Sequence, residues 1–309
     1  MTQTRERQGV RAVARRLAGT SLLLFAVLGA GCDRGAPGDA EAGDTAAPES
    51  FRPVELVDAA GKTHDLKQAP TRIVSLVPSA SAVLIALAEQ DRIVGRTEYD
   101  TAQVLTQVPS VGGGLEPNLE VLLSLQPDMV VRFEGPTDRR TPEQLDRAGI
   151  PHFAVRPDGI SDARRIIVEL GDMVGRRRGA DSLVAAIDAA LTDVQTHAAA
   201  FPPVRVAFVM GGTPPMVAGP GTFIHELIRV AGGVNVFSDL TQLYAPVSPE
   251  ELIDRDADVF LVLRGTELDP RLTRGVRIAE VGDGVQIPGP NLGDAAFEVA
   301  RALHPPTIP

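Results

Sequence analysis

Residues 158–200 read DGISDARRIIVELGDMVGRRRGADSLVAAIDAALTDVQTHAAA and contain no proline, although the chain has 25 prolines among its 309 residues. Apolar residues recur there at the three- and four-residue spacing of amphipathic helices: Ile166, Leu170, Met173 and Val174, then Leu183, Ile187, Leu191 and Val194. Gly175, beside the basic run 176–178, predicts a break between two helices. The second helix, from about Gly179 to Ala200, would be roughly 33 Å long at 1.5 Å per residue. We interpret it as a rigid connector between two lobes, and the alternative is a surface helix of one domain.

Composition limits the classes of partner. The chain is 44% hydrophobic, which is enough for one large core or two smaller ones. Its net charge is -10 and its basic residues are scattered, so we expect no nucleic-acid partner. Tryptophan is absent and aromatic residues make up 4%, so any aromatic cage around a ligand must be sparse.

The N-terminus has the pattern of an export signal. Five arginines precede a short apolar core, residues 17–28, and small residues then lead into Cys32, the only cysteine of the chain. The run Leu28-Gly29-Ala30-Gly31-Cys32 resembles a bacterial lipobox, with Gly29 where leucine is usual. This resemblance implies cleavage before Cys32, lipidation of that residue and anchoring to the cell-envelope membrane. An ordinary signal peptide with a chance cysteine is the alternative.

Strands and helices alternate in the region before the long helix. Apolar runs at 73–77, 93–95, 129–131 and 150–155 predict buried strands, and helical segments separate them. Ser79 or Ser81 can cap the helix that follows the first strand, and the amides of this helix would face a ligand beyond the strand end. The glycine run 112–114 lets bare backbone approach a ligand closely. The alternation predicts a parallel sheet with helical crossovers.

The region after the long helix repeats this order. Glu120 lies eight residues before Asp128, and Glu250 lies eight residues before Asp258, each glutamate in the first turn of a helix that leads into a strand. A glutamate in a first turn is also favoured by the helix dipole alone. Thr222 is the expected cap of the helix from Phe223 to Ala231.

The sequence contains no recognisable motif for catalysis or metal binding. Five histidines are scattered without carboxylates or cysteines at ligand spacing, and His225-Glu226 has Arg229 where a zincin helix needs its second histidine. No nucleophile elbow or phosphate-binding loop occurs. We therefore expect no enzyme activity, no cofactor and no metal site.

These motifs together resemble the class III periplasmic binding proteins that serve ABC importers of vitamin B12, siderophores and haem. The resemblance covers about residues 54–305 and rests on these segments: 72–79, 111–113, 117–120, 127–128, 219–221, 231–235, 247–251 and 288–304. It implies two Rossmann-like α/β lobes with central parallel sheets, joined by one long α-helix, and a ligand in the cleft between them. The expected organisation is a lipoprotein signal peptide (1–31), a flexible acidic tether (32–52), an N-terminal lobe (53–160), a helical connector (161–200) and a C-terminal lobe (201–309).

The resemblance also implies the site. It is closest to the cobalamin binders, whose cleft positions fall on Tyr99, Gly114, Phe133, Met210, Met216 and Tyr244. With Ser79 and Gly113 these are the expected ligand-binding residues, and the ligand is a corrinoid or a ferric chelate. Arginines favoured by siderophore binders have candidates in Arg132, Arg156 and Arg264. Glu120 and Glu250 would dock on a dimeric ABC permease.

Two functional hypotheses follow. The first is a lipid-anchored binding protein that delivers cobalamin, or alternatively a ferric siderophore or haem, to an ABC importer. The second is an envelope lipoprotein with the same fold that acts as a sensor or a structural partner.

Overall fold

The computed structural model describes residues 50–136, 138, 140–273 and 275–305. Its first sheet has four parallel strands, and the sequence predicts a parallel sheet here; the strand order is β4-β3-β5-β6. An antiparallel hairpin precedes this sheet in the chain. The elements of this half are β1 (Val54–Val57), β2 (Thr63–Leu66), β3 (Ile73–Ser75), α1 (Pro78–Ala86), η1 (Gln90–Arg92), β4 (Ile93–Gly95), η2 (Gln103–Leu105), α2 (Leu119–Ser124), β5 (Met129–Phe133), α3 (Arg140–Arg147) and β6 (His152–Val155).

The second sheet is mixed. Its strand order is β10-β8-β7-β11-β12, and β9 also pairs with β7. The pairs β7–β9, β7–β11 and β11–β12 are parallel, whereas β8 runs antiparallel to β7 and β10. The elements are β7 (Val204–Val209), β8 (Met216–Ala218), α6 (Phe223–Val230), β9 (Gly233–Asn235), β10 (Tyr244–Pro246), α7 (Pro249–Asp254), β11 (Val259–Leu263), β12 (Arg277–Val281), η3 (Asp283–Gln286) and α8 (Leu292–Leu303). The α/β class with central parallel strands is confirmed, and the second sheet adds two antiparallel strands, β8 and β10, to its parallel part.

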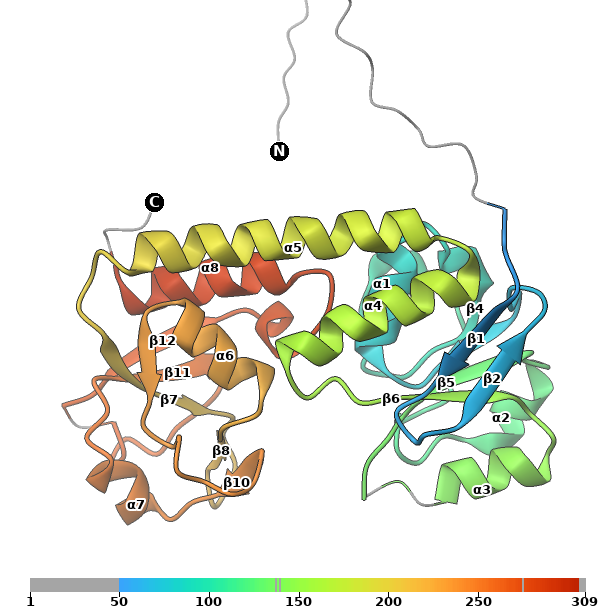
Figure 1. Cartoon of the computed structure of the whole chain (residues 1–309). Coiled ribbons are helices and arrows are strands. Elements are labelled where there is room, and N and C mark those ends of the chain that lie inside the picture. Colours follow the sequence, from blue (N-terminus) through green and yellow to red (C-terminus); the bar gives the residue numbers. More distant parts are fainter. Residues whose placement is uncertain (1–49, 137, 139, 274, 306–309) are drawn as a thin grey trace, which may run out of the picture. The chain divides into compact units, whose positions relative to one another are not determined.

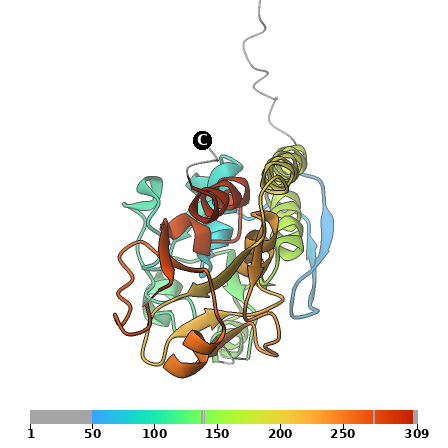
Figure 2. The same ribbon diagram turned by 90° about the vertical axis from the view of Figure 1, so that its left-hand side faces the viewer.

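Two helices connect the halves, with the break where the sequence predicts it. They are α4 (Ile160–Val174) and α5 (Arg177–Ala198), and Gly175 between them has a left-handed φ of 74°. Gly171 lets the two helices approach closely, because a Cβ at this position would lie 2.4 Å from the Cβ of Ala180. The helix α5 packs on α4 and also on α6 and α8, and Figures 1 and 2 show α8 lying beside it.

The core is built from the apolar faces that the periodicity indicates. On α4 the side chains of Ile166, Ile167, Leu170 and Met173 are buried, and on α5 the buried stripe is narrower. One cluster of buried residues includes side chains from α4, α5 and both sheets. The connector helices are therefore packed into the core shared by both halves, which restricts hinge motion about them.

Candidate functional site

A pocket forms where the carboxyl ends of the first sheet's strands meet the second half of the chain. Its volume is about 280 Å³. Because parallel strands place their carboxyl ends at one edge of a sheet, the segments after β3 and β4 converge there. The lining includes Ser79 and Tyr99 from those segments, Pro157 from the segment after β6, and Gln286, Ile287 and Pro288 from the C-terminal half. We call this the cleft pocket.

Ser79 lies in this pocket but does not cap α1. The helix begins with Pro78 at its first position, so the N-cap residue is Val77, which has no side chain that can accept a hydrogen bond. The hydroxyls of Ser79 and Ser81 are both buried without a hydrogen-bond partner. The prediction that one of these serines caps the helix is therefore wrong, and the Ser79 hydroxyl lies at the cleft pocket without a hydrogen-bond partner among the described residues.

Tyr99 separates the cleft pocket from a second pocket of about 330 Å³ along α1. The two pockets share Pro78, Tyr99 and Ile287, and Ser81 lines the second. Tyr99 is 64% exposed. It is thus the one predicted aromatic residue that faces both spaces.

The segment 156–159 links the two halves beside the cleft pocket. Asp158 accepts a hydrogen bond from Arg156 Nε through Oδ2 (2.5 Å), and its carbonyl accepts from Phe223 N at the start of α6 (2.6 Å). Burial and the nearby Asp158 carboxylate raise the pKa of Tyr244 to about 12. Tyr244 of the second sheet therefore lies near this segment and keeps a neutral phenol.

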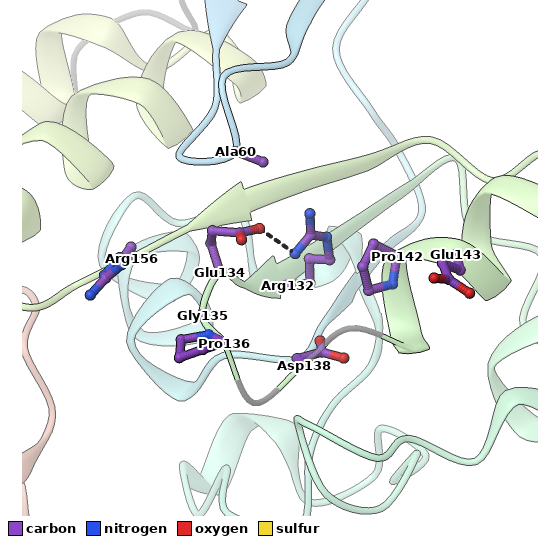
Figure 3. Close-up of a pocket in the computed structure, with 9 residues that line it drawn as sticks. All are labelled: Ala60, Arg132, Glu134, Gly135, Pro136, Asp138, Pro142, Glu143 and Arg156. Carbon is purple, nitrogen blue, oxygen red and sulfur yellow. Dashed lines mark hydrogen bonds and ion pairs between the residues drawn. The ribbon is translucent and has the colours of Figure 1, made fainter.

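A third pocket, of about 550 Å³, lies beside the ends of β5 and β6 and contains two of the arginines singled out in the sequence (Figure 3). We call it the arginine pocket. Arg132 is 3% exposed, and it donates from Nε to His152 Nδ1 (3.1 Å) and from Nη1 to Glu134 Oε2 (2.8 Å). The other residues that line the arginine pocket are Ala60, Gly135, Pro136, Asp138, Pro142, Glu143 and Arg156. Arg264, the third candidate arginine, lines none of these three pockets.

His152 under the arginine pocket has a fixed tautomer. Because Arg132 Nε–H donates to its Nδ1, the proton is on Nε2, which donates to Asp146 Oδ1 (3.1 Å). Burial lowers the pKa of His152 below its usual value, against the opposing effect of Asp146. A neutral His152 thus holds the buried guanidinium in place.

The remaining predicted ligand residues lie outside the cleft pocket's lining. Met210 N donates to Met216 O (2.8 Å), so these two methionines lie at adjacent strand ends of the second sheet. The Phe133 ring packs against Gly135, where a Cβ would come within 2.4 Å of the ring. A Cβ on Gly114 would lie 2.3 Å from Leu76 O, so close backbone packing is sufficient to require this glycine. Gly113 has no neighbour nearer than Glu98 Oε1, at 3.9 Å from the corresponding Cβ position.

The sequence reasoning did not select several residues that line the cleft pocket or the arginine pocket, among them Pro157, Gln286, Ile287, Pro288 and Asp138. Pro288 belongs to a motif that carried the family resemblance, and this was the available signal. Gln286 and Ile287 reach the pocket from more than a hundred residues beyond Pro157, and no local pattern marks them.

Glu120 and Glu250 lie exposed in the first turns of α2 and α7, as predicted. Asn118 caps α2 and Ser248 caps α7 through equivalent hydrogen bonds. Thr222 likewise caps α6, as predicted.

The repeat extends to how these two helices are held. Arg72 donates to the carbonyls of Leu125 and Gln126 after α2, and Arg205 donates to those of Arg255 and Asp256 after α7. Gln126 and Asp256 both have positive φ, 47° and 50°. Asp128 accepts from Arg72 N, and Asp258 from Arg205 N. The two glutamates therefore lie at equivalent corners of the two sheets, and equivalent hydrogen bonds hold each corner in place.

Among the described residues, no group of three or more histidine, cysteine, aspartate or glutamate side chains is arranged to hold a metal ion. A search of the same part of the chain finds no helix with the length and apolar character needed to cross a membrane. Cys32 and the predicted signal peptide lie outside the described residues.

Comparisons with known proteins agree with this architecture. The family model described as "Periplasmic binding protein" matches residues 73–274. An uncharacterized ABC transporter substrate-binding lipoprotein of Bacillus subtilis (strain 168) is 27% identical over 306 residues, covering 93% of this chain and 96% of the relative. A cobalamin-binding protein of Halobacterium salinarum (strain ATCC 29341 / DSM 671 / R1) is 29% identical over 286 residues, covering 83% of this chain and 75% of the relative.

Solved structures show the same fold. The apo periplasmic heme-binding protein of Roseiflexus sp. RS-1 matches with a TM-score of 0.66 and 26% identity, covering 75% of this chain and 99% of that one. The periplasmic vitamin B12 binding protein of Vibrio cholerae matches with a TM-score of 0.64 and 22% identity, covering 76% and 96%. The chain therefore belongs to the periplasmic binding protein family, the solute-binding components of ABC transporters.

Proposed function

We propose that this protein is the substrate-binding lipoprotein of an ABC importer, and that it captures a corrinoid such as cobalamin and delivers it to a permease dimer. The observation that carries the proposal is the cleft pocket, which takes its lining from both halves and presents the buried, unpartnered Ser79 hydroxyl beside the exposed Tyr99 ring. Several of the relatives are cobalamin- or vitamin B12-binding proteins.

The arrangement of the pockets supports a large ligand. The cleft pocket alone holds about 280 Å³, which is too little for a corrin ring with its side chains. The second pocket, which we call the α1 pocket, shares Pro78, Tyr99 and Ile287 with it, and Arg156 of the arginine pocket directly precedes Pro157 of the cleft pocket in the chain. A large chelate centred on the cleft pocket would extend parts into both neighbouring spaces.

Haem is the second candidate, because the structural relative with 26% identity is a heme-binding protein. A tyrosine ligates ferric iron as a phenolate. The pKa of Tyr244 is raised to about 12, so without a metal ion its phenol is neutral.

Two further parts of the proposal concern placement in the cell envelope. We expect Cys32 to be lipidated, since small residues precede it and a relative that covers nearly the whole chain is a lipoprotein. We expect Glu120 and Glu250 to bind cationic residues of the permease dimer. Two exposed carboxylates on equivalent corners of the two sheets suit a partner with two-fold symmetry.

Isothermal titration calorimetry on the protein lacking residues 1–32 tests the ligand assignment. The probes are cyanocobalamin, haemin and a ferric hydroxamate, each titrated separately. The proposal predicts one site for cyanocobalamin with a Kd of about 1 μM or lower, near -8 kcal/mol. If cyanocobalamin gives no heat of binding, or if either iron compound binds more tightly, the corrinoid assignment is wrong.

A further inference from the structure

Three described side chains have a buried polar atom without a hydrogen-bond partner, and each lines a different pocket. Ser79 lines the cleft pocket, Ser81 the α1 pocket, and Asp138 the arginine pocket. Asp138 differs from the serines because its orphan atom is a carboxylate oxygen, which can only accept hydrogen bonds when ionised. Leaving such an acceptor without a donor costs more than leaving a hydroxyl unpaired.

Asp138 lines the arginine pocket and carries a buried carboxylate oxygen without a hydrogen-bond partner in the part of the chain that the structure describes. The residue is 4% exposed. Its Oδ1 accepts from Thr141 N at the start of α3 (3.1 Å), which accounts for one oxygen as a helix cap. Its Oδ2 has no partner among the described residues. In Figure 3, Asp138 lies with Arg132 and Pro142 around the same hollow.

Hydrogen-bond donors are also available in this pocket. The Nε and Nη1 atoms of Arg132 are engaged by His152, Glu134 and the Phe133 carbonyl, while Nη2 makes no hydrogen bond to a described residue. Arg156 uses its Nε for Asp158, and its side chain is 46% exposed. The arginine pocket thus combines one buried acceptor that lacks a donor with guanidinium groups that can donate further hydrogen bonds.

We propose that the arginine pocket is a carboxamide subsite, in which Asp138 Oδ2 accepts from the amide NH₂ and an arginine donates to the amide oxygen. A neutral carboxamide has two donors and one acceptor on adjacent atoms, which matches both needs. A carboxylate has no donor and would bring a second negative charge to the buried Asp138. An ammonium group has no acceptor for the arginines and shares their charge.

The identity of the ligand rests on the proposed function, because the subsite would bind a peripheral group of the ligand that occupies the cleft pocket. Arg156 of the subsite directly precedes Pro157 of the cleft pocket. A corrinoid carries peripheral carboxamides around its ring, whereas haem carries carboxylates. The arginine pocket would therefore select the amide-bearing class of tetrapyrrole.

The test compares cyanocobalamin with its derivatives in which one propionamide has been hydrolysed to a carboxylate, each isomer measured separately by calorimetry. We expect one isomer to bind at least about tenfold more weakly than the parent, as for loss of a hydrogen bond to a charged group. In Asp138→Asn the cap on Thr141 is retained by the amide oxygen, while the orphan acceptor becomes a donor. This variant should abolish or reverse the preference for the amide over the acid.

Asp294→Asn is the matched control, since Asp294 is an exposed aspartate at the start of α8 and lines none of the three pockets. It should keep the preference of the wild type. Equal affinity of all isomers, or an unchanged preference in Asp138→Asn, would overturn the subsite while leaving corrinoid binding intact.

If cyanocobalamin itself does not bind, the proposed function fails and a fragment titration decides the subsite independently. Propionamide and propionate are added at millimolar concentrations to ¹⁵N-labelled protein. The subsite predicts that propionamide shifts the Thr141 amide resonance more than propionate does, and that Asp138→Asn reverses the order. An unresponsive Thr141 amide with both fragments overturns the proposal.

Discussion

Substituting Gly114 by alanine tests whether the glycine run serves the fold or the ligand. A Cβ at this position would lie 2.3 Å from the carbonyl oxygen of Leu76, and real Cβ atoms essentially never approach closer than 3.0 Å. The obstacle is backbone, so the strand end itself must move by at least about 0.7 Å. Leu76 is held on its other side by its amide, which donates to Val131 O (2.8 Å).

The size of the effect follows from this overpacking. Forcing one extra carbon into a packed site typically costs about 1–3 kcal/mol. For a domain of this size such a loss lowers Tm by about 2–10 °C. Because Leu76 directly precedes the cleft-pocket residues Val77, Pro78 and Ser79, we also expect the affinity for cyanocobalamin to fall.

Thermal unfolding followed by circular dichroism measures the cost, and Gly113→Ala is the matched control. Its Cβ would meet nothing nearer than Glu98 Oε1 at 3.9 Å, which is ordinary contact, and we expect its Tm to stay within about 2 °C of the wild type. A Gly114→Ala protein as stable as the wild type, or an equal loss in Gly113→Ala, would refute the reasoning.

Two other predictions concern docking and pH. Substituting arginine for both Glu120 and Glu250 should slow uptake of labelled cyanocobalamin by intact cells at least about tenfold and leave the calorimetric Kd unchanged. A higher Kd would instead place these residues in ligand binding. Since the pKa of His152 is lowered in the folded protein, the unfolded chain takes up a proton first as pH falls below about 6.5. The free energy of unfolding should therefore fall by up to about 1 kcal/mol per pH unit below this pH. Urea titrations at several pH values can measure this fall, and the His152→Gln variant should lose it. An identical pH dependence in that variant would contradict the assignment.

Elements with strong local patterns could be predicted from the sequence. The apolar stripes of α4 and α5 and the glycine between them indicate both helices and the break, because helical burial repeats every three to four residues. The buried strands β3 and β5 were equally visible as short apolar runs. The offset of Glu120 and Glu250 predicted equivalent corners, and the structure adds Arg72 and Arg205 as the groups that hold them.

Features that depend on distant contacts could not be predicted. The three-residue strands β8 and β10 are defined by antiparallel pairing with each other, and neither has a periodic pattern of its own. The role of Ser79 depended on where α1 begins, and Pro78 at the first position moved the N-cap to Val77. The cleft pocket joins Ser79 to Ile287, residues that only the tertiary structure brings together.

The visible absorption spectrum of the protein purified from its own host tests the central claim most directly, because corrinoids, haem and ferric siderophores absorb differently. The proposed function predicts the bands of a bound corrinoid, with no more than one corrinoid per chain. An intense Soret band of haem, or the broad charge-transfer band of a ferric siderophore, would contradict it.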